Sequence, residues 1–246
     1  RLIAGGHLGR FVAVPGANAR KGITKREDKM QQALYEKYRP KTWAELIGNE
    51  KAKSVIAFRR EHGGICNEAF WVKGKSGSGK TCIARLIAAE FGDPMQTVEI
   101  PGPDLSADRL REVISSWGYC TWSGKPHVLI VNEAHLLTKL MISRFLDLLE
   151  QIGRGDLGRV IVLFTSTLKG DKLFEEQLDS APFKSRCIEL TTIYQNAAEP
   201  FAKRCKEIAM AERMDGKPLE AYIQLAKDCE NNFRMMLETI SAGGMS

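Results

Sequence analysis

The chain has 246 residues, of which 43% are hydrophobic and 27% are charged, so it is long enough to bury one large core or two small ones. No stretch approaches the ~18 consecutive apolar residues that a membrane-spanning helix needs, so we expect no membrane partner. The six cysteines are scattered without a C-x-x-C pair, which argues against zinc, and we expect them to be reduced.

The net charge of +6 favours a polyanionic partner, but it is unevenly distributed. Residues 1–33 carry seven of the 36 Lys and Arg residues and two of the 30 Asp and Glu residues, so this segment has a net charge of +5 and the remainder is nearly neutral. We interpret residues 1–33 as a basic, flexible tail that either touches nucleic acid or an acidic partner or is simply solvated.

After this tail, strands are predicted to alternate with helices. Apolar runs predict strands at residues 69–72, 97–100, 127–131, 160–164 and 187–190. Apolar residues at helical spacing predict helices at about 49–62, 83–91, 106–117 and 138–152. Asn49, Ser106 and Thr138 are the predicted N-caps of three of these helices. Alternation of this kind indicates an α/β fold with a parallel sheet wound by right-handed crossovers.

From about residue 195 the strands stop and three amphipathic helices follow, the second opened by Pro218. We therefore expect an α/β domain at residues 34–193 and a small domain of three helices at residues 194–246, which the motifs below identify as a P-loop ATPase domain and its lid.

A glycine-rich loop joins the first strand to the next helix and matches the pattern G-x-x-x-x-G-K-[ST]. Backbone N–H groups of such a loop cradle phosphate oxygens, helped by the N-terminus of the helix. Lys80 would reach the β- and γ-phosphates, and Thr81 would place its hydroxyl on Mg²⁺. The predicted nucleotide-binding residues of this loop are Gly74, Lys75, Ser76, Gly77, Ser78, Gly79, Lys80, Thr81 and Cys82.

A second polar pair, Asn132 and Glu133, follows the apolar strand at 127–131. Acidic residues at the end of a strand beside a phosphate-binding loop handle Mg²⁺ and the attacking water. Glu133 is placed to orient or deprotonate that water. Asn132 stands where the usual pattern has Asp, so we expect Mg²⁺ to be held less strongly, through a neutral oxygen.

Three further motifs resemble those of AAA+ clamp-loader ATPases, such as replication factor C small subunits and the bacterial gamma/tau subunit. The segment Leu34–Trp43 with Ile47–Glu50 is similar to the opening box of that family, Phe183–Cys187 to its Ser-Arg-Cys motif, and Asn232–Arg234 to its second sensor. Together with the two motifs above, they fall in the family's order over residues 34–241.

The resemblance implies ATP and Mg²⁺ as cofactors and assigns further roles. Arg186 would be an arginine finger for ATP bound by a neighbouring subunit, and Arg234 would sense the γ-phosphate from the lid. Thr167 would be the first sensor, with Thr165 and Ser166 as adjacent alternatives. The implied adenine pocket comprises Tyr38, Arg39, Pro40, Ile47 and Gly48.

The chain also departs from the family. Its helical collar domain has no counterpart here, so the chain is either a fragment or assembles differently. Contacts with DNA through Arg109, Arg111, Lys139 or Arg144 are weaker expectations than solvated helix charges. Trp117, Tyr119 and Trp122 could stack on a base or a partner, but packing beneath a loop is the favoured interpretation.

The leading hypothesis is an intracellular ATPase subunit of a clamp loader, located in the cytoplasm or nucleoid, with an organelle, a nucleus or a virus-infected cell as alternative locations. Its partners would be other AAA+ subunits, a sliding clamp and primer–template DNA. One alternative is a nucleotide-held scaffold that hydrolyses ATP slowly or not at all. Another is a related AAA+ ATPase that remodels DNA.

Overall fold

The computed structural model describes residues 32–177, 181–193 and 197–245. Residues 33–246 form one compact unit. The predicted basic tail therefore lies almost wholly outside the described residues, and its role stays a prediction.

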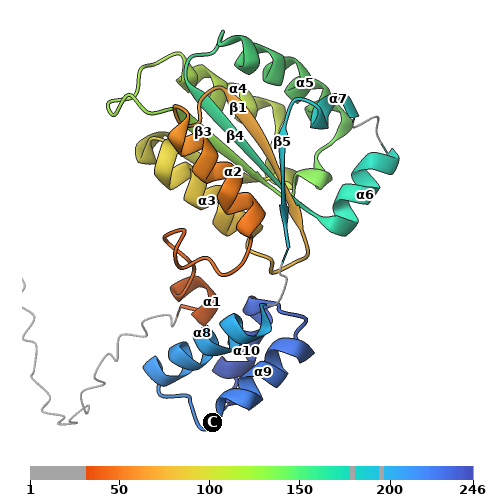
Figure 1. The fold of residues 1–246 in the computed structure, drawn as a ribbon. Helices are drawn as coiled ribbons and strands as arrows, with labels where there is room; N and C mark the ends of the chain where they lie inside the picture. The colour runs from red at the N-terminus through yellow and green to blue at the C-terminus, as the bar shows by residue number, and fades with distance from the viewer. Residues whose placement is uncertain (1–31, 178–180, 194–196, 246) are drawn as a thin grey trace, which may run out of the picture. The chain divides into compact units, whose positions relative to one another are not determined.

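A five-stranded parallel sheet forms the centre of this unit, in the order β2-β3-β4-β1-β5 (Figure 1). The strands are β1 Glu68–Gly74, β2 Thr97–Pro101, β3 His127–Asn132, β4 Val160–Thr167 and β5 Ile188–Thr192. This confirms the predicted α/β fold with a parallel sheet. The sheet is covered on both faces, which explains why β3 and β4 are almost continuously apolar.

Alternate strand residues feed two separate cores, one on each face of the sheet. Phe70 and Val72 pack with α2 (Glu50–Glu61) and α3 (Lys80–Phe91). Trp71 faces the other way, into a core that includes α4 (Ala107–Trp117) and α5 (Lys139–Arg154). Ser106 and Thr138 cap α4 and α5 as predicted, by accepting backbone N–H groups. Asn49 precedes α2, but its backbone is left-handed and its side chain makes no cap hydrogen bond, so that cap was wrongly predicted.

Two helices that the sequence did not predict follow β4. They are α6 (Leu168–Gln177) and α7 (Ala181–Lys184), and both contribute a phenylalanine, Phe174 and Phe183, to the core around Trp71. The short α7 ends just before the Ser-Arg-Cys motif.

A third core lies among the helices after the sheet, α8 (Ala198–Ala211), α9 (Leu219–Asp228) and α10 (Phe233–Ser241), which we call the lid helices. The three predicted helices are therefore present. The short α1 (Leu34–Lys37) also packs in this core through Leu34. The Tyr38 hydroxyl donates to Glu212 at 2.5 Å, which fastens the opening box to α8.

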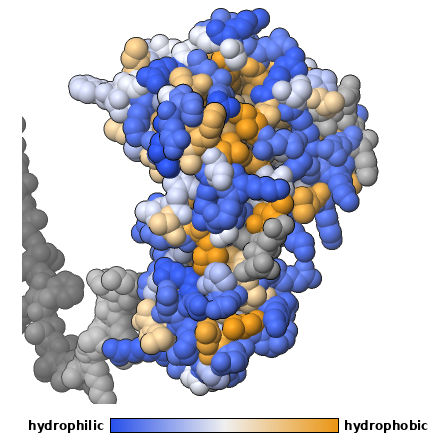
Figure 2. Space-filling model, in the orientation of Figure 1, coloured by the Kyte–Doolittle hydropathy of each residue, from blue (hydrophilic) through white to orange (hydrophobic). Residues whose placement is uncertain are grey.

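The surface is largely hydrophilic on the face drawn in Figure 2, with hydrophobic residues in small patches.

The three aromatic residues that were expected to pack beneath a loop differ in burial. Trp117 is buried, as expected, whereas Tyr119 and Trp122 are 76% and 104% exposed, so the expectation was wrong for these two. No helix in the described part of the chain is long and apolar enough to cross a membrane.

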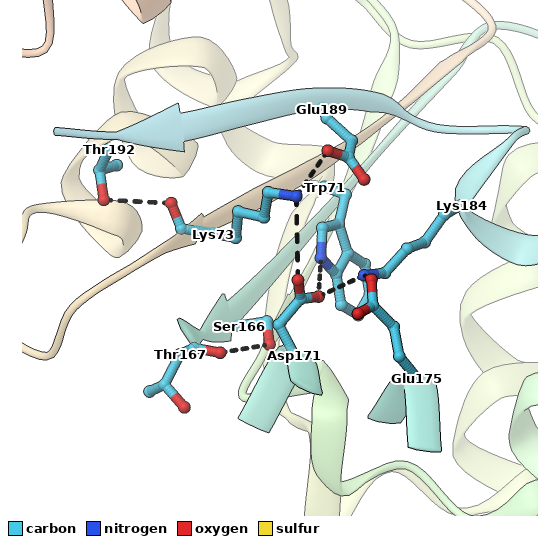
Figure 3. Close-up of polar contacts among 9 residues, drawn as sticks. All are labelled: Trp71, Lys73, Ser166, Thr167, Asp171, Glu175, Lys184, Glu189 and Thr192. Atoms are coloured by element: carbon cyan, nitrogen blue, oxygen red, sulfur yellow. Dashed lines mark hydrogen bonds and ion pairs between the residues drawn. The ribbon is translucent and has the colours of Figure 1, made fainter. Parts of the chain in front are cut away.

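A buried polar network ties β1 to α6 and α7 (Figure 3). The Trp71 indole N–H donates to Asp171 at 2.8 Å, and the Lys184 ammonium lies 2.7 Å from the same carboxylate. Lys73, one residue before the glycine-rich loop, is 3.8 Å from the other Asp171 oxygen. Burial alone lowers the pKa of Lys184, but hydrogen bonds to Asp171 and Glu175 outweigh it and raise the pKa above its usual value.

We predict that Asp171→Ala lowers the free energy of unfolding by about 3 kcal/mol or more, because it leaves the buried Trp71 donor and the Lys184 charge without their shared partner. Glu175→Ala is the matched control, since it removes the half-exposed carboxylate that also binds Lys184 and should cost less than about 1 kcal/mol. Urea denaturation followed by circular dichroism measures both losses. Equal losses would contradict a special role for the buried carboxylate.

Candidate functional site

The motifs meet at one edge of the sheet. Because the strands are parallel, the carboxyl ends of β1, β3 and β4 lie together, and these three strands are neighbours in the sheet. A pocket at this edge is lined by the glycine-rich loop, by the ends of β3 and β4, by residues of the opening box and by the lid helices. Its lining includes these predicted residues: Tyr38, Arg39, Pro40, Ile47, Ser76, Gly77, Gly79, Lys80, Thr81, Cys82, Asn132, Glu133, Thr167 and Arg234.

The glycine-rich loop turns through two glycines with left-handed backbones, Gly77 at φ +74° and Gly79 at φ +80°, and α3 begins at Lys80. The Lys80 ammonium donates to the Lys75 carbonyl at 2.8 Å, and burial lowers its pKa to about 8. A half-buried cation beside a helix N-terminus is a suitable environment for phosphate.

Thr192, at the end of β5, braces the loop from outside the pocket. Its hydroxyl lies 2.5 Å from the Ser78 hydroxyl and donates to the Lys73 carbonyl at 3.2 Å. A Cβ on Gly74 would lie 1.7 Å from the same hydroxyl oxygen, so only glycine fits there. Gly74, Lys75 and Ser78 therefore shape the loop without lining the pocket. Sequence reasoning missed Thr192, because nothing near it in the chain marks it.

Asn132 and Glu133 are held by a neighbouring hydroxyl. Thr165, on β4, donates to the amide oxygen of Asn132 at 3.0 Å and accepts the backbone N–H of Glu133 at 3.2 Å. Thr81 also donates to the Asn132 oxygen, at 3.3 Å. Glu133 adopts a left-handed backbone, φ +54°, which is costly for a non-glycine residue and turns the chain as it leaves the strand.

The three first-sensor candidates have different partners. The Thr165 hydroxyl already forms hydrogen bonds with Asn132 and with the Glu133 backbone. Ser166 donates to the Thr167 carbonyl at 3.1 Å. Thr167 accepts the backbone N–H of Gly170 at 3.0 Å, at the start of α6. Its hydroxyl hydrogen remains able to donate to a ligand, so Thr167 as first sensor stays a prediction.

The opening box and the lid helices line the pocket together. Tyr35 and Phe233 join the predicted adenine-pocket residues, whereas Gly48 stays outside the lining. The Arg234 guanidinium lies over the Tyr35 ring, 4.9 Å from its centroid. Its positive charge further lowers the pKa of Lys80, behind the larger effect of burial.

Arg186 is separate from the pocket. Its guanidinium pairs with Glu150 of α5 and donates to the Pro182 carbonyl at 2.6 Å, and its side chain is partly exposed. The structure therefore does not bring Arg186 to the nucleotide site of its own chain.

The basic residues of α4 that were considered as weaker candidates for DNA contact form ion pairs within that helix. Arg109 pairs with Glu112 and Arg111 with Asp108, each at 2.5 Å and three residues apart. These pairs agree with solvated helix charges, and DNA binding through them stays a hypothesis.

The donor set fits Mg²⁺ brought in with a nucleotide. No group of three or more His, Cys, Asp or Glu side chains in the described residues could hold a metal ion by itself. The Thr81 hydroxyl and the Asn132 amide oxygen, however, converge beside the glycine-rich loop. Mg²⁺ commonly takes one or two protein oxygens and completes its shell with phosphate and water.

Comparisons with known proteins agree with this geometry. The model of the ATPase family associated with various cellular activities (AAA) matches residues 70–188. The chain is 29% identical over 144 residues to the DNA polymerase III subunit gamma/tau of Mycobacterium tuberculosis, and 26% identical over 143 residues to the tau subunit of Escherichia coli. These alignments cover 48% and 49% of this chain but only 25% and 22% of the relatives, so the chain spans about a quarter of their length.

Solved structures share the fold. The Holliday junction branch migration motor RuvB of Thermotoga maritima superposes with a TM-score of 0.63 at 21% identity, over 83% of this chain and 64% of RuvB. A DNA polymerase III gamma subunit-related protein of the same organism gives a TM-score of 0.51 at 15% identity, over 77% and 57% of the two chains.

We predict that Gly77→Ala weakens nucleotide binding at least about tenfold, because a left-handed backbone costs a residue with a Cβ roughly 1–2 kcal/mol. The new Cβ would also lie 2.0 Å from the Asn232 side chain, which opens α10. Gly118→Ala is the control, because its Cβ meets no atom within 4 Å. Titration with a fluorescent ATP analogue measures both, and equal affinities would contradict the prediction.

Proposed function

From an AAA domain at residues 70–188 that is related to those of DNA polymerase III gamma/tau subunits, we propose that this chain binds ATP with Mg²⁺ and hydrolyses it as a subunit of a DNA sliding-clamp loader. The observation that carries the proposal is the convergence of Lys80, Thr81, Asn132, Glu133 and Arg234 on one pocket. The proposed partners are other AAA+ subunits, a sliding clamp and primer–template DNA, and the proposed site of action is inside the cell.

In this mechanism the glycine-rich loop and Lys80 hold the β- and γ-phosphates. Mg²⁺, once bound with ATP, neutralises phosphate charge, and Thr81 and Asn132 are the residues that would hold it. Glu133 orients the attacking water or takes its proton. Arg234 would neutralise the γ-phosphate from the lid helices, which moves its guanidinium from Tyr35 to the nucleotide and couples the lid to ATP.

Arg186 completes the site of a neighbouring subunit. Its position outside its own pocket, on a partly exposed surface, supports a role in trans. A guanidinium fork matches phosphate oxygens and neutralises charge that develops at the γ-phosphate. To reach that phosphate Arg186 must leave Glu150, so the ion pair is a resting position for the finger.

Two alternatives have specific support. Asn132 favours a scaffold that binds ATP but turns it over slowly, since it offers Mg²⁺ a neutral oxygen. Sequence similarity to the Holliday junction branch migration complex subunit RuvB of Streptomyces avermitilis, 29% identical over 116 residues, favours an ATPase that remodels branched DNA.

We predict that Glu133→Gln and Arg186→Ala each lower ATP turnover at least about 100-fold while ATP binding persists. Mixing the two variants should restore part of the turnover, because an Arg186→Ala subunit keeps an intact pocket and receives the finger of its Glu133→Gln neighbour. Steady-state phosphate release from each variant and from the mixture measures this. Loss of turnover without recovery on mixing, in a mixture shown to assemble, would contradict a finger in trans.

The choice among the three functions follows from which DNA stimulates the wild-type chain. A clamp loader should be stimulated several-fold by primer–template DNA and little by a four-way junction. A branched-DNA remodeller should show the reverse preference. Tight ATP binding with no turnover on either DNA would contradict the motor proposal and support the scaffold.

A further inference from the structure

The side-chain amide of Asn132 has different partners on its two sides. Its oxygen accepts from the hydroxyls of Thr81 and Thr165, at 3.3 and 3.0 Å. Its nitrogen donates to a carboxylate oxygen of Glu99 at 2.6 Å. Turning the amide over would set its oxygen against the Glu99 carboxylate, acceptor against acceptor. The network therefore fixes the oxygen on the side of the glycine-rich loop.

Glu99 is held in place by two elements. It lies on β2, whose register sets Pro101 opposite Asn132. Arg85 of α3 holds both Glu99 oxygens, with Nε at 2.7 Å and Nη2 at 3.0 Å. Arg85 follows Thr81 by one helical turn, so Thr81, Asn132, Glu99 and Arg85 form a closed chain of contacts between α3, β3 and β2. Glu99 is not among the residues that line the pocket.

We propose that Glu99 is a positioning residue for Mg²⁺, acting through Asn132. Its carboxylate accepts the side-chain N–H of Asn132, and this contact holds the Asn132 oxygen toward the ion that accompanies ATP. Asn132 and Glu99 thus divide between them a task usually given to one carboxylate. This inference rests on the proposed binding of Mg²⁺ and ATP in this pocket.

The hydrogen bond between Asn132 and Glu99 has a consequence for substitutions at position 132. Asn132→Asp would put two carboxylates where one N–H···O hydrogen bond now stands, at 2.6 Å. Like charges at that separation repel and push one carboxylate out of place. The substitution that gives position 132 its usual residue therefore works only when the charge of Glu99 is removed as well.

An ordinary structural ion pair between Arg85 and Glu99 would give a different result. In that case, loss of Glu99 would affect folding or nucleotide binding in general, with or without the metal. The discriminating quantity is thus the gain in affinity that Mg²⁺ provides, defined as the ratio of the dissociation constants in EDTA and in Mg²⁺.

The experiment measures binding of a slowly hydrolysed γ-thio analogue of ATP by calorimetry, in EDTA and in Mg²⁺. Glu99→Ala removes both the acceptor and the charge, so the gain from Mg²⁺ should fall about tenfold while affinity in EDTA stays unchanged. Glu99→Gln keeps an acceptor for Asn132 and removes only the charge, so its loss should be smaller. For Asn132→Asp alone, the gain in affinity from Mg²⁺ should be no larger than for the wild type. For Asn132→Asp combined with Glu99→Gln, this gain should be about tenfold larger than for Asn132→Asp alone.

Glu68→Gln is the matched control, because Glu68 also pairs with an arginine, Arg59 at 2.6 Å. Its side chain is 24% exposed against 27% for Glu99, and it lies at the start of β1, the opposite end from the glycine-rich loop.

Two results would overturn this inference but leave the proposed function standing. One is a gain in affinity from Mg²⁺ that does not change when Glu99 is substituted, and the other is an equal gain for Asn132→Asp and for the double variant. Absence of any nucleotide binding in the wild-type chain would overturn the proposed function itself. Thermal unfolding of each variant confirms that it is folded. If Glu99→Ala does not fold, Glu99→Gln still tests the inference.

Discussion

The hydroxyl of Thr165 is the contact on which the arrangement of the site depends. It binds the side chain of Asn132 and the backbone of Glu133 at once, and so joins the ends of β3 and β4. The sheet order makes this possible, because β4 lies between β3 and β1, the strand that leads into the glycine-rich loop. In a parallel sheet the carboxyl ends of neighbouring strands share one edge, which is where such folds place their ligands. The phosphate-binding loop and the polar pair are thus brought together by the sheet itself.

The opening box gives this site a connection to the lid helices. Leu34 packs in the core of those helices, and the Tyr38 hydroxyl donates a hydrogen bond to Glu212 at the end of α8. Tyr35 and Tyr38 also line the pocket. In the proposed function, a nucleotide in the pocket would therefore contact a segment that is packed against the lid helices. Asn232 adds a second link, because its side chain caps α10 and lies against Gly77 of the loop. The start of α10 therefore lies directly beside the glycine-rich loop.

Local signals made most of this fold predictable from the sequence. The glycine-rich loop, the five strands and the capping of α4 and α5 each depend on residues close together in the chain. Contacts between distant strands were not predictable: Thr192 supports the loop, and Glu99 supports Asn132, only because the sheet sets β5 beside β1 and β2 beside β3. Tyr119 and Trp122 were wrongly expected to be packed, because aromatic content alone does not tell a covered loop from an exposed one. Helices α6 and α7 were not predicted because each buries mainly one phenylalanine, which leaves no apolar face at helical spacing, and α7 has only four residues.

The charged residues of the site form two separate groups, one in the pocket and one at the ion pair of Arg186 with Glu150. Lys80 and Arg234 bring two cations to the pocket, close enough for Arg234 to lower the pKa of Lys80, and the carboxylate of Glu133 has the opposite effect. In the proposed function, the phosphates of ATP relieve this excess of positive charge. Arg186 has its charge met by Glu150 on another surface, so it adds nothing to the pocket of its own chain. In the proposed function, the pocket of one chain binds the nucleotide, and Arg186 of another subunit adds a further cation at the γ-phosphate. Under that proposal, nucleotide binding needs one chain, whereas turnover needs two neighbouring subunits.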